Sequence, residues 1–360
     1  MRPKPGRDWR QAHFRVGHRE TAVMSAYGFK DSENAAWNGL ALLYVAAGYG
    51  LGLVALIHGG VLLSIIGTLW LAHAMTIAAY LLHECGHNAI FSTNARNGRL
   101  GTALTWITGS CYGTYEDIRV KHFRHHVDSA DVMWFESRRW FNTHPLSARI
   151  VQLLEWFYIP AHDLVMHFVM VFGAFIIPAR RGQRLRNASV IVVRASLFAS
   201  LAWFFPRAAL GYVVAYLLMM TVLRFMDALQ HDYGGVPVLF ADVVMPHRGD
   251  RTYEQAHTFS NPLSLRNPWL NLLVLNFGYH NAHHAKPTTP WFRLPALHRE
   301  LYGDDESRVI LFWPSCKSFH RYRVSRVVGE STSEEGEAYL ALARVGAVSG
   351  GNAVSFLTSF

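Results

Sequence analysis

Four long apolar segments, arranged as two pairs, constrain the fold of this chain more than any other feature. A transmembrane helix needs about 20 apolar residues, because each residue adds about 1.5 Å along the helix axis. The four segments cover residues 40–57, 61–82, 188–205 and 208–226. Three residues separate the first pair and two separate the second, so each pair is predicted to form a helical hairpin. The predicted fold is therefore an all-α integral membrane protein with four transmembrane helices in two hairpins.

The composition supports this fold class. Of the 360 residues, 51% are apolar and 16% are charged, whereas a soluble domain carries roughly 25% charged residues. The three cysteines are too few for a disulfide framework, which is typical of a reducing compartment. The net charge of +9 could indicate a nucleic-acid partner, but the sequence contains no nucleic-acid-binding motif. The basic residues instead favour a membrane-surface face that could receive an acidic electron carrier.

The distribution of Lys and Arg predicts the orientation of the four helices. Seven precede the first apolar segment, twelve lie between the second and third segments, and Arg207 is the only one in the two short turns. By the positive-inside rule, both termini and the central segment are predicted to be cytosolic. Arg194 and Arg224 lie near the cytosolic ends of apolar segments, where we expect structural roles for them.

The chain is predicted to have three parts. Residues 1–35 form a basic cytosolic segment, residues 36–305 the membrane domain, and residues 306–360 a cytosolic tail. The tail is predicted to be partly disordered, because beyond Arg326 it is acidic and rich in small residues. Residues 164–177 are apolar but too few to span a bilayer, and they are interpreted as an interfacial or re-entrant helix.

Eight of the 20 histidines fall in three short clusters. The first cluster is residues 83–87 (HECGH), the second is residues 122–126 (HFRHH), and the third is residues 280–284 (HNAHH). Histidines three or four residues apart project from the same face of a helix, so each cluster presents two or three imidazoles to a common point. Neutral imidazole binds iron, zinc and copper. Eight imidazoles exceed what one tetrahedral zinc ion uses, which favours two metal ions of higher coordination number.

The predicted topology places the clusters on one side of the membrane. The first cluster begins where the second apolar segment returns to the cytosol, and the other two lie in cytosolic stretches. The fourth apolar segment returns on the same side and brings Asp227 and His231 with it. We therefore expect nine histidines to meet in a cytosolic helical cap at the ends of the two hairpins.

The order H-x3-H, H-x2-H-H and H-x2-H-H around two hairpins resembles the integral-membrane fatty-acid desaturase and hydroxylase superfamily, from about Leu40 to His298. The resemblance implies a diiron site. It implies that the iron ligands include His83, His87, His122, His125, His126, His280, His283 and His284. In animal acyl-CoA desaturases a further ligand histidine lies four residues after an asparagine, and His231 matches it, with Asp227 in place of the asparagine. Asp227 is thus a candidate to bind iron, to hold a water molecule or to orient His231. The interval from His231 to His280 is longer than in those enzymes, which favours an inserted lid or substrate loop.

The resemblance also implies a function. A desaturase would use O2 and two electrons, delivered by a separate ferredoxin or cytochrome b5, to introduce a C=C bond into a fatty-acyl or lipid substrate. A lipid or carotenoid hydroxylase or ketolase of the same superfamily remains an alternative, because the outcome depends on how the substrate is placed. The expected protein is a multi-pass membrane enzyme with its active site in the cytosol.

Two other classes of protein are compatible with parts of the pattern. The first cluster has the sequence H-E-x-x-H of zinc metalloproteases, some of which are embedded in membranes, with Glu84 as the general base. That interpretation leaves the second and third clusters unexplained. A metal-storing or metal-transporting protein is also disfavoured, because transport sites usually lie near the bilayer midplane.

Other histidines and a cysteine are weaker candidates for metal ligands. His257 is a weaker candidate, because it lies outside the clusters. Cys85 lies two residues from both His83 and His87, on the opposite helix face, so it is not expected to bind the metal. The isolated histidines are expected to be structural: His58, His73 and His162.

Overall fold

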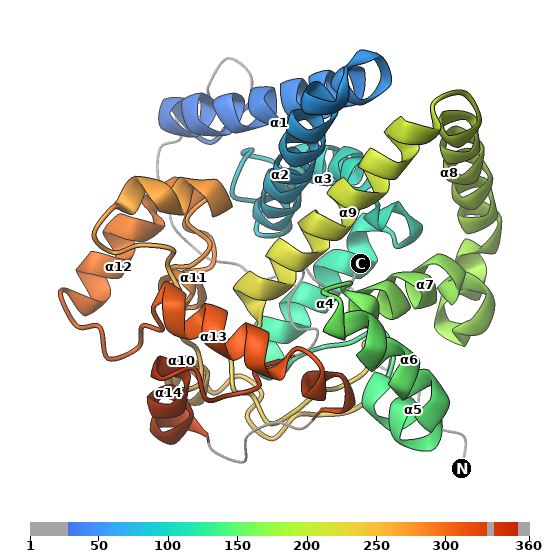
Figure 1. Cartoon of the computed structure of the whole chain (residues 1–360). Coiled ribbons are helices and arrows are strands. Elements are labelled where there is room, and N and C mark those ends of the chain that lie inside the picture. Colours follow the sequence, from blue (N-terminus) through green and yellow to red (C-terminus); the bar gives the residue numbers. More distant parts are fainter. Residues whose placement is uncertain (1–27, 330–334, 352–360) are drawn as a thin grey trace, which may run out of the picture.

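A computed structural model describes residues 28–329 and 335–351, and these residues are helical, with isolated β-bridges but no strand among them. Four helices are long and apolar enough to cross a membrane (Figure 1). They are α1 (Ser32–His58), α2 (Val61–Gly86), α8 (Arg184–Phe204), which continues from the 3-10 turn η3 (Pro178–Gln183), and α9 (Pro206–Asp227). The prediction of an all-helical chain with four candidate spans is confirmed.

The candidate spans pack in an order that leaves α2 and α9 at the centre. Helix α1 lies against α2, α2 against α9, and α9 against α8; α9 runs diagonally between α2 and α8 in Figure 1. Glycines allow α1 and α2 to approach closely, since a methyl group at Gly67 would lie 3.0 Å from the carbonyl oxygen of Gly52.

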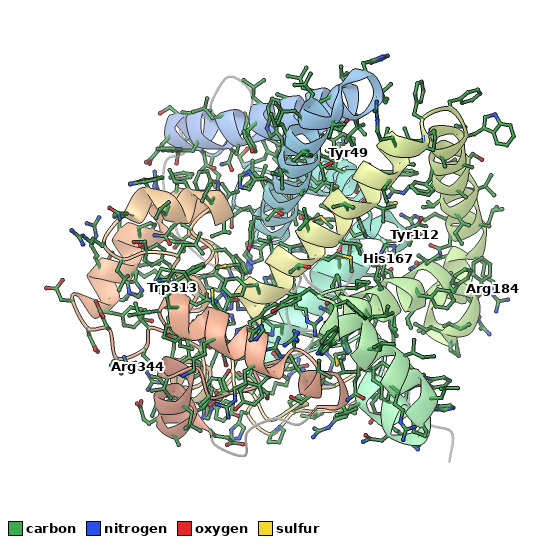
Figure 2. All side chains as sticks on the ribbon, viewed as in Figure 1. Tyr49, Tyr112, His167, Arg184, Trp313 and Arg344 are labelled. Atoms are coloured by element: carbon green, nitrogen blue, oxygen red, sulfur yellow. The ribbon has the colours of Figure 1, made fainter. Side chains whose placement is uncertain are left out.

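The outer surface of these helices is apolar. Side chains of α8 project away from the rest of the molecule (Figure 2), and Leu197 and Trp203 are largely exposed. Leu62 and Leu63 at the start of α2 are exposed as well. A large exposed apolar surface of this kind is typical of a protein surrounded by lipid.

The remaining helices lie between and after the two pairs of spans. They are α3 (Asn94–Thr108), α4 (Tyr115–Asp128), α5 (Ser137–Thr143), α6 (Pro145–Trp156), α7 (Ala161–Ile176), α10 (Arg251–Ala256), α11 (His280–Ala285), α12 (Leu294–Tyr302), α13 (Phe312–Tyr322) and α14 (Gly336–Arg344). Helix α7 is the short apolar helix expected from the sequence, and its interfacial or re-entrant position stays a prediction. Arg194, within α8, donates to the carbonyl of Trp106 in the last turn of α3 at 2.7 Å, which is a structural role.

The segment between His231 and the third cluster packs along the end of α4. Backbone hydrogen bonds pair Met133 with Pro237 (2.9 Å) and with Leu239 (2.7 Å). Arg124 of α4 donates to the carbonyl of Leu239 at 2.8 Å and also pairs with Asp128 at 2.8 Å. The backbone N–H of Gly249 also donates to the carbonyl of Val127 in α4 at 2.8 Å. This segment, predicted as a lid or substrate loop, is therefore tied to the helix that carries the second cluster and to the residues that follow it.

Within the described residues, part of the C-terminal tail is helical and packed. In α14, Tyr339, Leu340 and Ala343 are buried against Ala228 and other residues at the end of α9. The backbone N–H of Gly351 also donates to the carbonyl of Ala228 at 2.7 Å. This packing is difficult to predict from the sequence. The apolar face of α14 is short, and the acidic residues before it dominate the average composition of the tail. Residues 1–27, 330–334 and 352–360 lie outside the described residues, so the prediction for the first segment is not addressed there.

Replacing Leu340 with alanine tests this packing. We expect a loss of about 2–5 kcal/mol in the free energy of unfolding, because a buried leucine is replaced by a cavity. Val345 is 57% exposed, and its replacement with alanine is expected to change the free energy by less than about 0.5 kcal/mol. Chemical unfolding of the detergent-solubilised protein, followed by circular dichroism, measures both. Equal effects of the two substitutions would contradict a packed α14.

Candidate metal centre

The three histidine clusters come from helices that converge below the ends of α2 and α9. The first cluster occupies the last turn of α2 and its C-cap residue, His87. The second lies on α4, whose start is fixed by a capping box between Thr114 and Asp117. The third forms α11, and His231 follows the end of α9. All nine histidines are buried.

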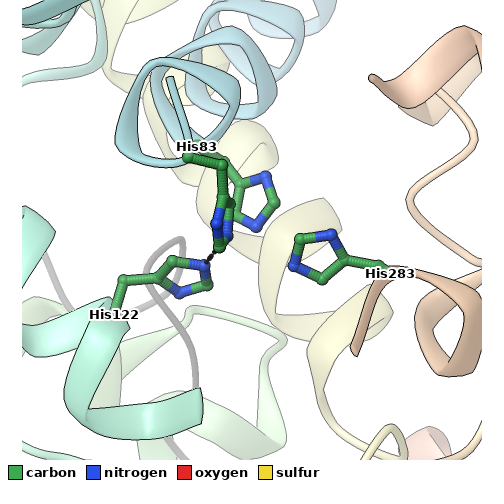
Figure 3. A group of neighbouring side chains, drawn as sticks. His83, His122 and His283 are labelled. Atoms are coloured by element: carbon green, nitrogen blue, oxygen red, sulfur yellow. Dashed lines mark hydrogen bonds between the residues drawn. The ribbon is translucent and has the colours of Figure 1, made fainter. Parts of the chain in front are cut away.

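One set of imidazoles, here called the first group, combines all three clusters. Its ring nitrogens lie within 4.8 Å of one another and belong to His83, His87, His122 and His283. The Nε2 atoms of His87 and His122 are 2.6 Å apart. Figure 3 shows His83, His122 and His283 approaching a common space from different helices. The Nε2 of His126 borders this group, 3.1 Å from that of His122 and 3.3 Å from that of His283.

A second group lies beside the first. It consists of His125, His231, His280 and His284, again with ring nitrogens within 4.8 Å of one another. The Nε2 of His280 is 2.8 Å from that of His231 and 3.0 Å from that of His284. The structure thus brings together all nine histidines expected from the sequence, and divides them between two adjacent groups.

Two histidines of the second group, His125 and His284, have the protonation pattern that a metal ion requires. A neutral imidazole carries one N–H donor and one acceptor nitrogen. His125 Nδ1 lies 3.0 Å from the carbonyl oxygen of Ala130, and His284 Nδ1 lies 2.8 Å from Glu254 Oε1. Both Nδ1 atoms therefore carry the proton, which leaves the Nε2 lone pairs available. The Nε2 of His125 is buried and has no hydrogen-bond partner. A bound cation would satisfy these converging acceptors, so the residues fit a metal centre.

Burial keeps these imidazoles in the form that binds metal. It lowers the pKa of the His125 imidazole to about 3. It also lowers the pKa of His280, His283 and His284 well below the ordinary value, and neighbouring histidines add to the effect. The rings are therefore neutral at pH 7, and an all-imidazole donor set suits iron, zinc, copper and nickel.

Three buried carboxylates lie on the outer, Nδ1 side of the histidines. Glu84 Oε1 is 3.4 Å from His83 Nδ1, and Oε2 accepts the backbone N–H of Trp291 at 3.0 Å. Asp131 and Glu254 face other rings of the site. Burial raises the pKa of Glu254 to about 7, while Arg251 beside it lowers this pKa. Sequence reasoning missed Asp131 and Glu254 as parts of the site, because neither stands at a helical spacing from a histidine cluster.

Asp227, the further candidate ligand, is buried at the end of α9. Within the described residues it is not part of any group of side chains that could hold a metal. Its charge acts on Lys121 of α4 and on Asp131. Its suggested contact to the iron therefore stays a prediction without support from the geometry.

The weaker candidates are engaged elsewhere. His257 Nδ1 lies 2.8 Å from Asp232 and does not join either group. Cys85 is buried without joining a group among the described residues. His162 Nε2 lies 3.0 Å from the hydroxyl of Ser137, which is a structural contact.

Comparison with known proteins agrees with this arrangement. The family model described as fatty acid desaturase matches residues 59–315, which is most of the chain. The matched region contains the three histidine clusters and His231. A search of curated proteins found no match.

Proposed function

The chain belongs to the fatty acid desaturase family, and from this premise we propose that it is a membrane-bound diiron desaturase that introduces a C=C bond into a fatty-acyl or lipid substrate. Family membership implies an oxidoreductase of the desaturase and hydroxylase superfamily. The observation that carries the proposal is the pair of adjacent, buried groups of imidazoles. One zinc ion would use only four of these nine side chains.

Each group of histidines would hold one iron. The proposed ligands of the first iron are His83, His87, His122, His126 and His283. The proposed ligands of the second iron are His125, His231, His280 and His284. When bound, the irons supply the activation of O2 that oxidation of an unactivated C–H bond requires. The chain contributes neutral nitrogens at fixed positions and a buried setting that excludes competing water.

The orientation in the membrane is part of the proposal. We place both termini and the histidines in the cytosol, because Lys and Arg gather in the segments that flank the spans on that side. The two hairpins then present a cytosolic cap that carries the histidines. In this proposal residues 1–35 are a cytosolic segment, residues 36–305 the membrane domain and residues 306–360 a cytosolic tail. The electrons come from a separate ferredoxin or cytochrome b5, for which the basic cytosolic surface is suited.

Metal analysis and lipid profiling test this function. The purified protein is expected to bind two irons per chain; a single zinc would support the metalloprotease instead. Expression in a bacterial host, together with a ferredoxin and its reductase, is expected to give new double bonds in the host lipids. New hydroxyl groups would instead support the hydroxylase alternative. A chain that is loaded with two irons and reduced by its donor, yet leaves every supplied lipid unchanged, would contradict the proposal.

A further inference from the structure

Glu254 lies where the two groups of histidines meet. It belongs to α10, in the segment between His231 and the third cluster. Asp250 fixes the start of this helix, because its Oδ1 accepts the backbone N–H groups of Thr252 and Tyr253, each at 3.0 Å. The Glu254 side chain is 1% exposed, so its contacts are with protein groups rather than with bulk water.

One oxygen of this carboxylate faces a histidine of each group. Glu254 Oε1 lies 2.8 Å from His284 Nδ1 and 3.6 Å from His126 Nδ1. The centroids of the two imidazole rings are 4.2 Å apart. His284 belongs to the second group, whereas the Nε2 of His126 borders the first group.

The side from which Glu254 approaches decides its role. It faces the Nδ1 atoms of both rings, while their Nε2 atoms point to the other histidines. A metal bound at Nε2 therefore lies on the far side of each ring from the carboxylate. Glu254, His126 and His284 themselves have potential ligand atoms within 4.8 Å of one another. With the two metals at the Nε2 atoms, Glu254 is placed to orient the rings and not to bridge the metals as a ligand.

The other outer carboxylates serve one group each. Glu84 faces His83, which is in the first group. Asp131 Oδ1 lies 3.8 Å from His125 Nδ1 and 3.9 Å from His231 Nδ1, and both histidines are in the second group. Glu254 alone among these three carboxylates contacts both groups.

Arg251 holds Glu254 in this position from the protein surface. Its guanidinium donates to Glu254 Oε2 at 2.5 Å and to the backbone carbonyls of His284 (2.8 Å) and Ala285 (3.0 Å). It thereby joins α10 to α11 and leaves Oε1 for the histidines. The Arg251 side chain is 54% exposed. Contacts therefore connect the solvent, through Arg251 and Glu254, to the imidazoles.

We propose that Glu254 is a positioning residue shared by both iron sites: it hydrogen-bonds His284 of one site and raises the basicity of this ligand, and it faces His126 Nδ1 of the other site at 3.6 Å and orients that ring. This inference rests on the proposed function, because it requires two irons. It assigns the segment between His231 and the third cluster a part in building the metal centre. A hydrogen-bonded carboxylate on a ligand imidazole strengthens metal binding, and its loss typically costs about 10- to 100-fold in affinity.

Glu254→Gln is the main variant for the test, because glutamine keeps the size of the side chain and an oxygen that can accept from His284. Glu254→Ala removes the contact entirely. Protein loaded with ⁵⁷Fe is examined by Mössbauer spectroscopy, and iron release to a chelator is followed in parallel. We expect Glu254→Gln to alter the signals of both irons, and Glu254→Ala to weaken retention of the iron bound by His284, which loses a hydrogen-bonded partner, by about 10- to 100-fold.

Glu84→Ala and Asp131→Asn are the matched controls. Each removes or neutralises a buried carboxylate that faces one group, so each is expected to alter the signal of one iron, a different one in the two variants. The inference is overturned if Glu254→Gln alters a single iron signal, or neither, while wild-type protein holds two irons. Wild-type protein that holds fewer than two irons would contradict the proposed function itself.

Discussion

Replacement of His231 with asparagine is expected to abolish substrate oxidation and to reduce the bound iron by about one ion per chain. His231 is the single histidine of the site that lies outside the three clusters, and its Nε2 is 2.8 Å from that of His280 and 3.2 Å from that of His284. Asparagine is too short to place a donor atom at the same point. The affinity for the second iron should fall by more than the roughly 10- to 100-fold that removal of a hydrogen-bonded partner of a ligand causes. Iron analysis and product formation measure it.

His257 provides the matched control for this substitution. It is 26 residues further along the chain, and its imidazole pairs with Asp232 instead of joining the histidine groups. Asparagine can replace its Nδ1 donor, so His257→Asn is expected to retain both irons. If His257→Asn lost an iron while His231→Asn kept both, the proposed ligand set would be wrong.

Replacement of Arg224 with methionine is expected to destabilise the protein by about 3–5 kcal/mol, because the buried Glu155 carboxylate loses its counter-charge and Asp163 loses its ion-pair partner. Arg224 Nη1 lies 2.5 Å from Glu155 Oε1 and 3.3 Å from Asp163 Oδ2, and all three side chains are buried. Burial raises the pKa of Asp163 to about 8, against the opposing effect of Arg224. Methionine preserves the apolar stem of the arginine while it removes the charge. Chemical unfolding in detergent measures the change.

The exposed pair between Lys286 and Glu300 is the comparison for this network. Its N–O distance is 3.3 Å, and both side chains are more than half exposed. Lys286→Met is expected to change the free energy of unfolding by less than about 1 kcal/mol. A similar small effect for Arg224→Met would show that the buried charges are compensated by another route.

The candidate spans and the histidines of the site could be predicted from the sequence because both depend on local patterns. A span requires only a run of apolar residues, and histidines at positions i and i+4 share a helix face wherever the helix lies. The partners of Arg224 could not be predicted in this way. The structure pairs Arg224 with Glu155 of α6 and Asp163 of α7, which come from helices far from α9 in the sequence, so no local pattern connects them.

Contacts between distant segments also account for the parts of the site that sequence reasoning missed. Glu254 reaches the histidines because α10 packs against α11, and no spacing in the sequence encodes this contact. Similarly, the apolar face of α14 is only a few residues long, and the sequence alone does not show that it packs against the end of α9. Asp227, a candidate from a local match to a family pattern, does not join either histidine group among the described residues, and its role stays a prediction.

The mixing of all three clusters in the first group also has a consequence for how the protein is made. His83 and His283 share this group, although 200 residues separate them in the chain. At a synthesis rate of about 5–20 residues per second, roughly 10–40 s pass between their translation. The early histidines emerge from the ribosome long before their partners exist. A metal ion that is bound by both histidines therefore enters a nearly finished polypeptide.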